Sequence, residues 1–145
     1  HKAIRRQRQM CIRDRRIARA EAITRKRDPI TFHAFIGMPA IHGGIGGPQV
    51  MADQLEHVLE MGRRDNITIQ AVDLSGAATF AHAGSFILYQ FANMPAAVYH
   101  EHLSSCAVLV EDSDVAAIKT AAETLRREAM SPEATAELIA SVIPR

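Results

Sequence analysis

Two histidines flank a glutamate in the run His100-Glu101-His102, the pattern in the chain that comes closest to a metal site. Histidines two residues apart on a strand point to the same face, so both imidazoles could reach one ion. The same alternation sends Glu101 to the opposite face together with Tyr99, and no third ligand stands at a suitable spacing. Strand histidines are commonly half-exposed packing residues. We therefore predict no metal site.

A glycine-rich segment, residues 43–47, precedes a predicted helix in the way that a phosphate-binding loop would. The Lys-Ser/Thr pair of such loops does not follow it, and Pro48 removes one backbone donor. Glycine clusters most often mark connections between elements. We therefore interpret this segment as a loop and predict no cofactor.

Two further groupings could support catalysis. Ser104 and Ser105 adjoin His102 without a third orienting residue, and Cys106 beside them is interpreted as a small core residue. Asp73 and Glu101 could share acid–base work only if the fold brought them together, which their spacing does not indicate. We predict no catalytic residues and a protein that is not an enzyme.

Charge is distributed unevenly along a chain of ordinary composition. The 145 residues are 48% hydrophobic and 23% charged, as in one folded domain of common size. Eleven basic and two acidic residues precede Asp28, so that segment carries +9 and the remainder −8. We divide the chain into a basic helical arm, residues 1–28, and a single α+β domain, residues 29–145. The acidic domain is a poor surface for phosphate backbones, so any nucleic-acid contact within this chain would come from the arm.

The two cysteines, Cys11 and Cys106, are far apart and show no ligand spacing, which suits a reducing compartment. No apolar run approaches the roughly 18 residues that a membrane helix needs. We expect a cytoplasmic protein that does not contact a membrane.

Hydrophobic periodicity predicts the order strand, helix, four strands, two helices. Residues 4–27 form a helix that Asp28-Pro29 ends, since the residue before proline leaves the helical region. The three later helices begin at Pro48, after the acidic cluster of residues 111–114, and at Pro132 with Ser131 as its cap. We expect the strands to form one mixed sheet of four or five strands, flanked by helices. They cover residues 30–36, 67–74, 85–91, 96–102 and 105–110.

Several runs in combination resemble one known family. They are residues 50–59 (VMADQLEHVL), 66–72 (NITIQAV), 84–88 (GSFIL), 97–101 (AVYHE) and 129–135 (AMSPEAT). Residues 97–101 look like the family's hydrophobic-Tyr-x-Glu strand. Residues 129–135 look like the start of its closing helix, Ala-Leu-Ser-x-x-x-Ser. The chain, from about residue 16 to residue 145, resembles the C-terminal domain of unknown function of actinobacterial Xre-family helix-turn-helix regulators, often described as antitoxin-like.

The resemblance implies a transcription regulator whose DNA-reading domain lies upstream of His1. This domain would supply signal input, dimerisation or the binding of a small protein encoded nearby, and we expect a homodimer. Tyr99 and Glu101 are the candidate ligand- or partner-binding residues. Two alternatives stay open: a stand-alone antitoxin-like interaction module, and a small-molecule or metal-binding enzyme.

Two parts of the sequence depart from the family pattern. The acidic residue that the family usually carries after the first strand is replaced near Met38. Residues 10–15, Met-Cys-Ile-Arg-Asp-Arg, look like translated sequencing-adaptor read-through, so part of the basic arm is hypothesised to be an artefact. An intact gene encoding these residues in frame would refute that hypothesis.

Overall fold

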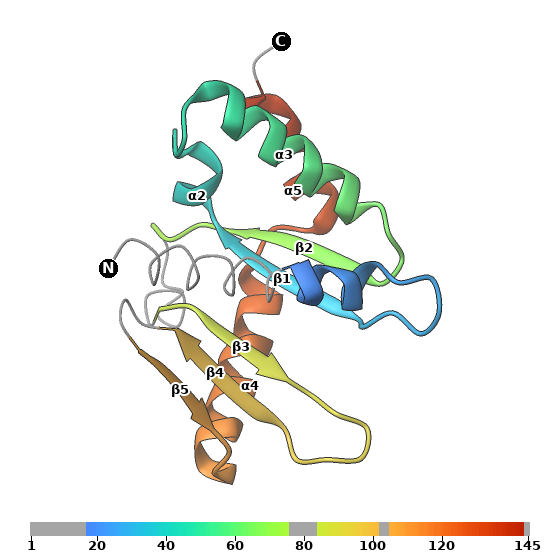
Figure 1. Ribbon diagram of the computed structural model, residues 1–145. Coiled ribbons are helices and arrows are strands. Elements are labelled where there is room, and N and C mark those ends of the chain that lie inside the picture. The colour runs from blue at the N-terminus through green and yellow to red at the C-terminus, as the bar shows by residue number, and fades with distance from the viewer. Residues whose placement is uncertain (1–16, 76–83, 102–104, 144–145) are drawn as a thin grey trace, which may run out of the picture.

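The computed structural model describes residues 17–75, 84–101 and 105–143, which form two sheets and their covering helices (Figure 1). A helix over residues 17–24 comes first. The elements that follow are β1 (Phe32–Gly37), α2 (Met38–His42), α3 (Pro48–Gly62), β2 (Ile67–Val72), β3 (Phe86–Tyr89), β4 (Ala97–Glu101), β5 (Cys106–Leu109), α4 (Asp112–Glu128) and α5 (Pro132–Val142). The α+β class and the two C-terminal helices are as the sequence predicts.

The prediction of one mixed sheet of four or five strands is wrong. β1 and β2 pair in parallel as a two-stranded sheet, and β3, β4 and β5 form a separate antiparallel sheet in that order. Ala71 shows why no further strand adds at the edge formed by β2. Its N–H donates to Thr135 Oγ1 at 2.9 Å, and its carbonyl accepts from the Met130 N–H at 2.9 Å. The α4–α5 junction thus occupies the edge of β2 where a further strand would add.

A polar side chain is buried inside this arrangement. Gln70 in β2 is only 7% exposed, and its Oε1 lies 2.6 Å from His33 Nε2 on β1. Its amide nitrogen donates to the Met130 carbonyl at 2.8 Å. Both ends of the amide are therefore hydrogen-bonded, as burial of a polar group requires. The contacts tie β1, β2 and the α4–α5 junction together.

Two apolar clusters hold the elements. The first joins α2, α3 and α5 to β2 and contains the buried Ile41, Leu55, Ala71 and Ile139. The second contains the buried Val72 of β2 and Leu125 of α4, with Phe35 and Phe86 packed against them. Because Phe35 lies on β1 and Phe86 on β3, the second cluster joins α4 to both sheets.

Local sequence explains where the helices begin. α3 starts at Pro48 after the predicted glycine-rich loop, where Gly46 and Gly47 have φ of 82° and 94°, a region that favours glycine. α5 starts at Pro132, and the Ser131 hydroxyl accepts from the Ala134 N–H at 3.1 Å, as predicted. The sequence did not predict α2, because five residues are too few for a helical period to show.

The helix over residues 17–24 is the part of the predicted arm that the structure describes, together with residues 25–28. It is hydrogen-bonded to the turn between α3 and β2. Arg64 Nη2 donates to the Thr24 carbonyl at 2.9 Å, and the Asn66 amide donates to the Ile23 carbonyl at 3.0 Å. Across the described ranges, no helix combines the length and the apolar character that crossing a bilayer demands.

Candidate functional site

Strand β4 carries Tyr99 and Glu101, the two candidate ligand- or partner-binding residues. Tyr99 is opposite Ile87 on β3 and Val108 on β5, and Glu101 is opposite Cys106. They share one face of the three-stranded sheet, as predicted from their spacing. The neighbouring Val98 points the other way and is fully buried on the side that α4 covers (Figure 1).

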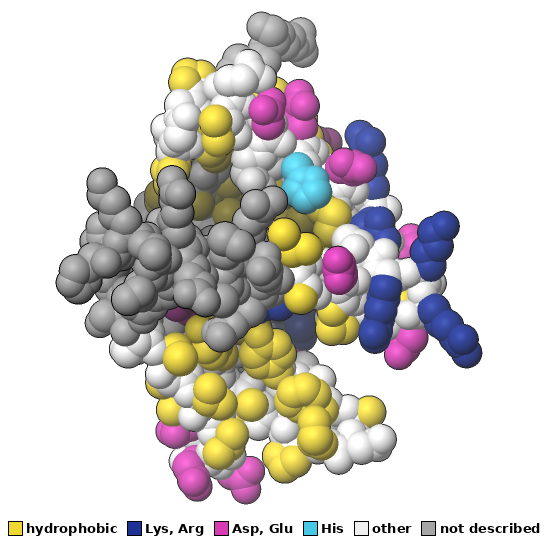
Figure 2. All heavy atoms as spheres, viewed as in Figure 1, with side chains coloured by type: hydrophobic (Ala, Val, Ile, Leu, Met, Phe, Trp, Pro, Cys, Tyr) yellow, Lys and Arg dark blue, Asp and Glu magenta, His cyan; other side chains and the backbone are white. Residues whose placement is uncertain are grey.

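The face away from α4 is apolar and exposed, and we call it the outer face. It comprises Ile87, Tyr89 and Phe91 from β3 and the residues after it, Tyr99 and Glu101 from β4, and Cys106 and Val108 from β5. Figure 2 shows hydrophobic side chains gathered over the lower part of the molecule, where Figure 1 places this sheet.

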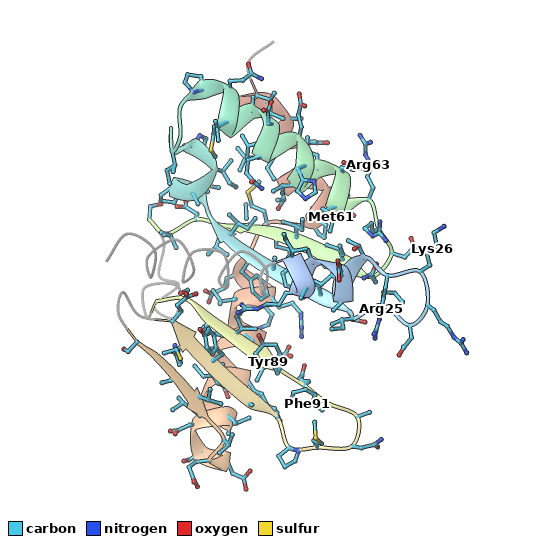
Figure 3. The ribbon with its side chains drawn as sticks, viewed as in Figure 1. Arg25, Lys26, Met61, Arg63, Tyr89 and Phe91 are labelled. Carbon is cyan, nitrogen blue, oxygen red and sulfur yellow. The ribbon has the colours of Figure 1, made fainter. Side chains whose placement is uncertain are left out.

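Exposure of these side chains is substantial. Ile87 is 37% exposed, Tyr89 38% and Val108 62%. The Tyr89 and Phe91 rings are stacked with centroids 6.3 Å apart and an interplanar angle of 14°, and Figure 3 shows them side by side at the end of β3. Single exposed apolar residues are ordinary on protein surfaces, whereas a contiguous apolar patch marks an interaction surface.

Tyr99 lies half-buried at the middle of the outer face. The pKa of its hydroxyl is raised above the usual value, chiefly because burial disfavours the phenolate. Cys106 and Glu101 act in the same direction, while Arg19 from the helix over residues 17–24 opposes them. Tyr99 therefore presents a neutral hydroxyl, which can donate one hydrogen bond beside a carboxylate that accepts them.

Cys106 is exposed, so its interpretation as a core residue is wrong. Alternation along β5 places its side chain on the outer face with Val108, which is the face away from α4. The sequence alone could not show this, because both faces of β5 carry small or apolar side chains.

The structure does not assemble the metal pattern. His100 Nδ1 lies 3.3 Å from the Ser85 carbonyl, and its ring is 6.4 Å from that of Phe86. His102 and Ser104 lie outside the described residues. Within the described ranges, no three His, Cys, Asp or Glu side chains come together in a way that could hold an ion.

Asp73 follows β2, in the other sheet from Glu101. Its carboxylate accepts from the Ser75 N–H at 2.8 Å, and the pKa of Asp73 is lowered by hydrogen bonds from Ser75. This hydrogen bond is local to the loop after β2, because Ser75 lies two residues after Asp73.

A second surface is basic. Arg25, Lys26 and Arg27 follow the helix over residues 17–24, and Arg63 and Arg64 follow α3. The hydrogen bond from Arg64 to Thr24 brings the two segments together, and Figure 3 shows Arg25, Lys26 and Arg63 at the same end of the molecule. Arg25 also pairs with Asp28 at 3.6 Å. Exposed pairs of this kind contribute little to stability.

The fold and the site define a small α+β domain that presents an apolar sheet face and, where residues 25–27 meet Arg63 and Arg64, a local basic surface. The chain belongs to the family described as domain of unknown function DUF5753, whose model matches residues 4–141. Neither the curated proteins nor the solved structures contain a match. The family match thus confirms one part of the predicted resemblance, namely that the chain is a domain of unknown function.

Proposed function

We propose that this domain is the non-catalytic regulatory part of a helix-turn-helix transcription regulator, and that it binds a small protein through the outer face. The link to DNA rests on the resemblance of the sequence runs to Xre-family regulators. The proposal that the domain binds a small protein rests on the exposed apolar side chains of the outer face. The DNA-reading domain would lie upstream of His1.

The single observation that carries the proposal is the exposed apolar character of the outer face. Removing apolar surface from water contributes about 25 cal/mol per Å², so covering Ile87, Tyr89, Phe91 and Val108 favours association. Tyrosine and phenylalanine are enriched at protein interfaces, where tyrosine combines a large ring with a polar group. Tyr99 and Glu101 would add directional hydrogen bonds to this apolar surface.

Charge around the outer face indicates the chemistry of the partner. Glu101 lies on the face, and Glu111, Asp112 and Asp114 stand where β5 leads into α4. Figure 2 shows acidic side chains below the apolar patch. A complementary partner would place basic side chains around an apolar centre, since matched potentials speed association and exclude wrong partners.

Co-purification with the product of the adjacent gene tests the binding mode. We expect Tyr89→Glu to abolish co-purification, because it places a charge within the apolar face. Val50→Glu is the matched control: Val50 is 57% exposed on α3, away from this sheet, so binding should survive. Equal binding by both variants, each well folded by circular dichroism, would refute the role of the outer face.

DNA binding tests the regulatory context. We expect the 145-residue chain to give no specific electrophoretic shift at physiological salt, and the full-length regulator to shift its operator. Tight operator binding by this chain alone would contradict the proposal. A gene with a start codon near His1 and no upstream helix-turn-helix would favour the stand-alone antitoxin-like module instead.

A further inference from the structure

Strand β5 forms the free edge of the three-stranded sheet. It pairs with β4 on one side, and on its other side no strand of the described part of the chain lies against it. The second edge strand, β3, is placed differently, because Phe86 packs against Val72 and Leu125 between the two sheets. β5 is therefore the peripheral edge of the molecule, as Figure 1 shows.

The sequence of this edge lacks the features that keep sheets apart. Residues 105–110 read Ser-Cys-Ala-Val-Leu-Val, with no charge, proline or glycine. Natural edge strands are usually protected by lysine, proline, a bulge or a covering element, because their unpaired N–H and C=O groups accept another strand. Within the described part of the chain, α4 packs mainly on β2, β3 and β4, so this helix does not protect the β5 edge.

Exposure of the outer face is greatest at the same edge. In the cross-strand row Ile87–Tyr99–Val108, Ile87 is 37% exposed, Tyr99 is half-buried and Val108 is 62% exposed. Val110, just past the strand, is 58% exposed. An added strand would cover these two β-branched side chains, which are suited to cross-strand contact.

We propose that β5 pairs antiparallel with β5 of a second copy about a two-fold axis at Val108, giving a continuous six-stranded sheet. Such an axis, perpendicular to the sheet, keeps both outer faces on the same side and places Val108 opposite Val108 and Cys106 opposite Val110. This inference rests on the proposed function, since helix-turn-helix regulators commonly read two half-sites as dimers.

Charge favours a second copy as the occupant. The acidic residues Glu111, Asp112 and Asp114 stand at the C-terminal end of β5. In an antiparallel pair these two acidic groups lie at opposite ends of the joined strands, each next to the uncharged Ser105 and Cys106 of the partner strand, with Glu101 one strand further away. A parallel arrangement would bring the groups together, and like charges at close range repel. The uncharged strand between them is complementary to itself.

The test is the mass of the 145-residue chain in solution, measured by sedimentation over a range of concentrations. We expect a dimer whose dissociation constant rises by at least about tenfold in Val108→Lys, because each copy would place a charge at the axis. Val50→Lys, on the exposed surface of α3, is the matched control and should leave the dimer intact. A folded chain that is monomeric at every concentration would overturn the proposal and leave the edge to a foreign strand.

The register has its own test. In a background of Cys11→Ser and Cys106→Ser, Val108→Cys should cross-link two copies on oxidation, because directly opposed residues have Cα atoms about 4.5–5.5 Å apart, within disulfide range. Val50→Cys in the same background should not cross-link. If Val108→Lys leaves the dimer intact, or if Val108→Cys does not cross-link it, the dimer forms through another surface and the proposal is wrong. Tyr89→Glu lies on β3, away from the β5 edge, so a Tyr89→Glu chain that stays dimeric but loses the partner would separate this proposal from the proposed function.

Discussion

At the residue scale, the start of α5 shows how one polar cluster secures a distant strand. Ser131 caps the helix, and one turn later the buried Thr135 accepts a hydrogen bond from β2. Glu133 lies between them in the first turn. The pKa of Glu133 is lowered, first by its own backbone N–H and then by the Ser131 hydroxyl. A carboxylate at this position is also favoured by the helix dipole.

The lowered pKa of Glu133 makes a prediction about stability and pH. Because the folded state binds the proton less tightly than the unfolded state, the stabilisation is present above the usual pKa of 4.5 and is lost as the pH falls through the folded value. We expect Glu133→Gln to have a lower free energy of unfolding than the parent at neutral pH. This difference in stability should shrink as the pH falls below the usual pKa of 4.5. Denaturant unfolding at several pH values measures this. Glu137→Gln controls for net charge, and a difference independent of pH would contradict the assignment.

At the scale of elements, α4 is the component that connects the two sheets. Leu125 is 4% exposed and packs in the cluster that contains Val72, Phe35 and Phe86. The helix contacts β2 of the first sheet and β3 and β4 of the second, so it packs on both sheets. The position of the outer face relative to the rest of the molecule therefore depends on this helix.

Truncating Leu125 tests that role. Leu125→Ala should lower the free energy of unfolding by about 2–5 kcal/mol, because it removes buried methyl groups and leaves a cavity. Lys119→Ala, an exposed position on the same helix, should change it by no more than about 0.5 kcal/mol. Urea unfolding followed by circular dichroism gives both values. Similar values for the two variants would show that α4 does not hold the sheets together.

At the scale of the whole molecule, two separate sheets behave as one unit if the shared cluster couples them. The chain contains no tryptophan and two tyrosines, Tyr89 and Tyr99, both in the three-stranded sheet. Tyrosine fluorescence therefore reports on that sheet alone, whereas far-ultraviolet circular dichroism is dominated by the helices, including α3 and α5 beside the first sheet.

We expect the two signals to give coincident unfolding transitions in urea, because Leu125 and Phe86 join the sheets in one core. The parent chain and Leu125→Ala should be compared, since weakening the junction should separate the transitions if coupling passes through it. Separate transitions in the parent itself would mean that the two sheets fold independently.

The sequence by itself determined every strand, every long helix and the shared face of the candidate site. Alternating hydrophobicity located all five strands, helical periodicity located α3, α4 and α5, and the spacing of Tyr99 and Glu101 placed both on one face. These features depend on local periods of about 2 and 3.6 residues, which any short window of the chain displays.

Only the tertiary structure decided how the strands divide into two sheets. That division depends on Met130 and Thr135 reaching the edge of β2 from about 60 positions along the chain, and a local pattern does not encode such competition for backbone hydrogen bonds. The same holds for the exposure of Cys106 and for the basic surface where residues 25–27 meet Arg63 and Arg64. Long-range packing, which selects one partner for each edge and face, set all three.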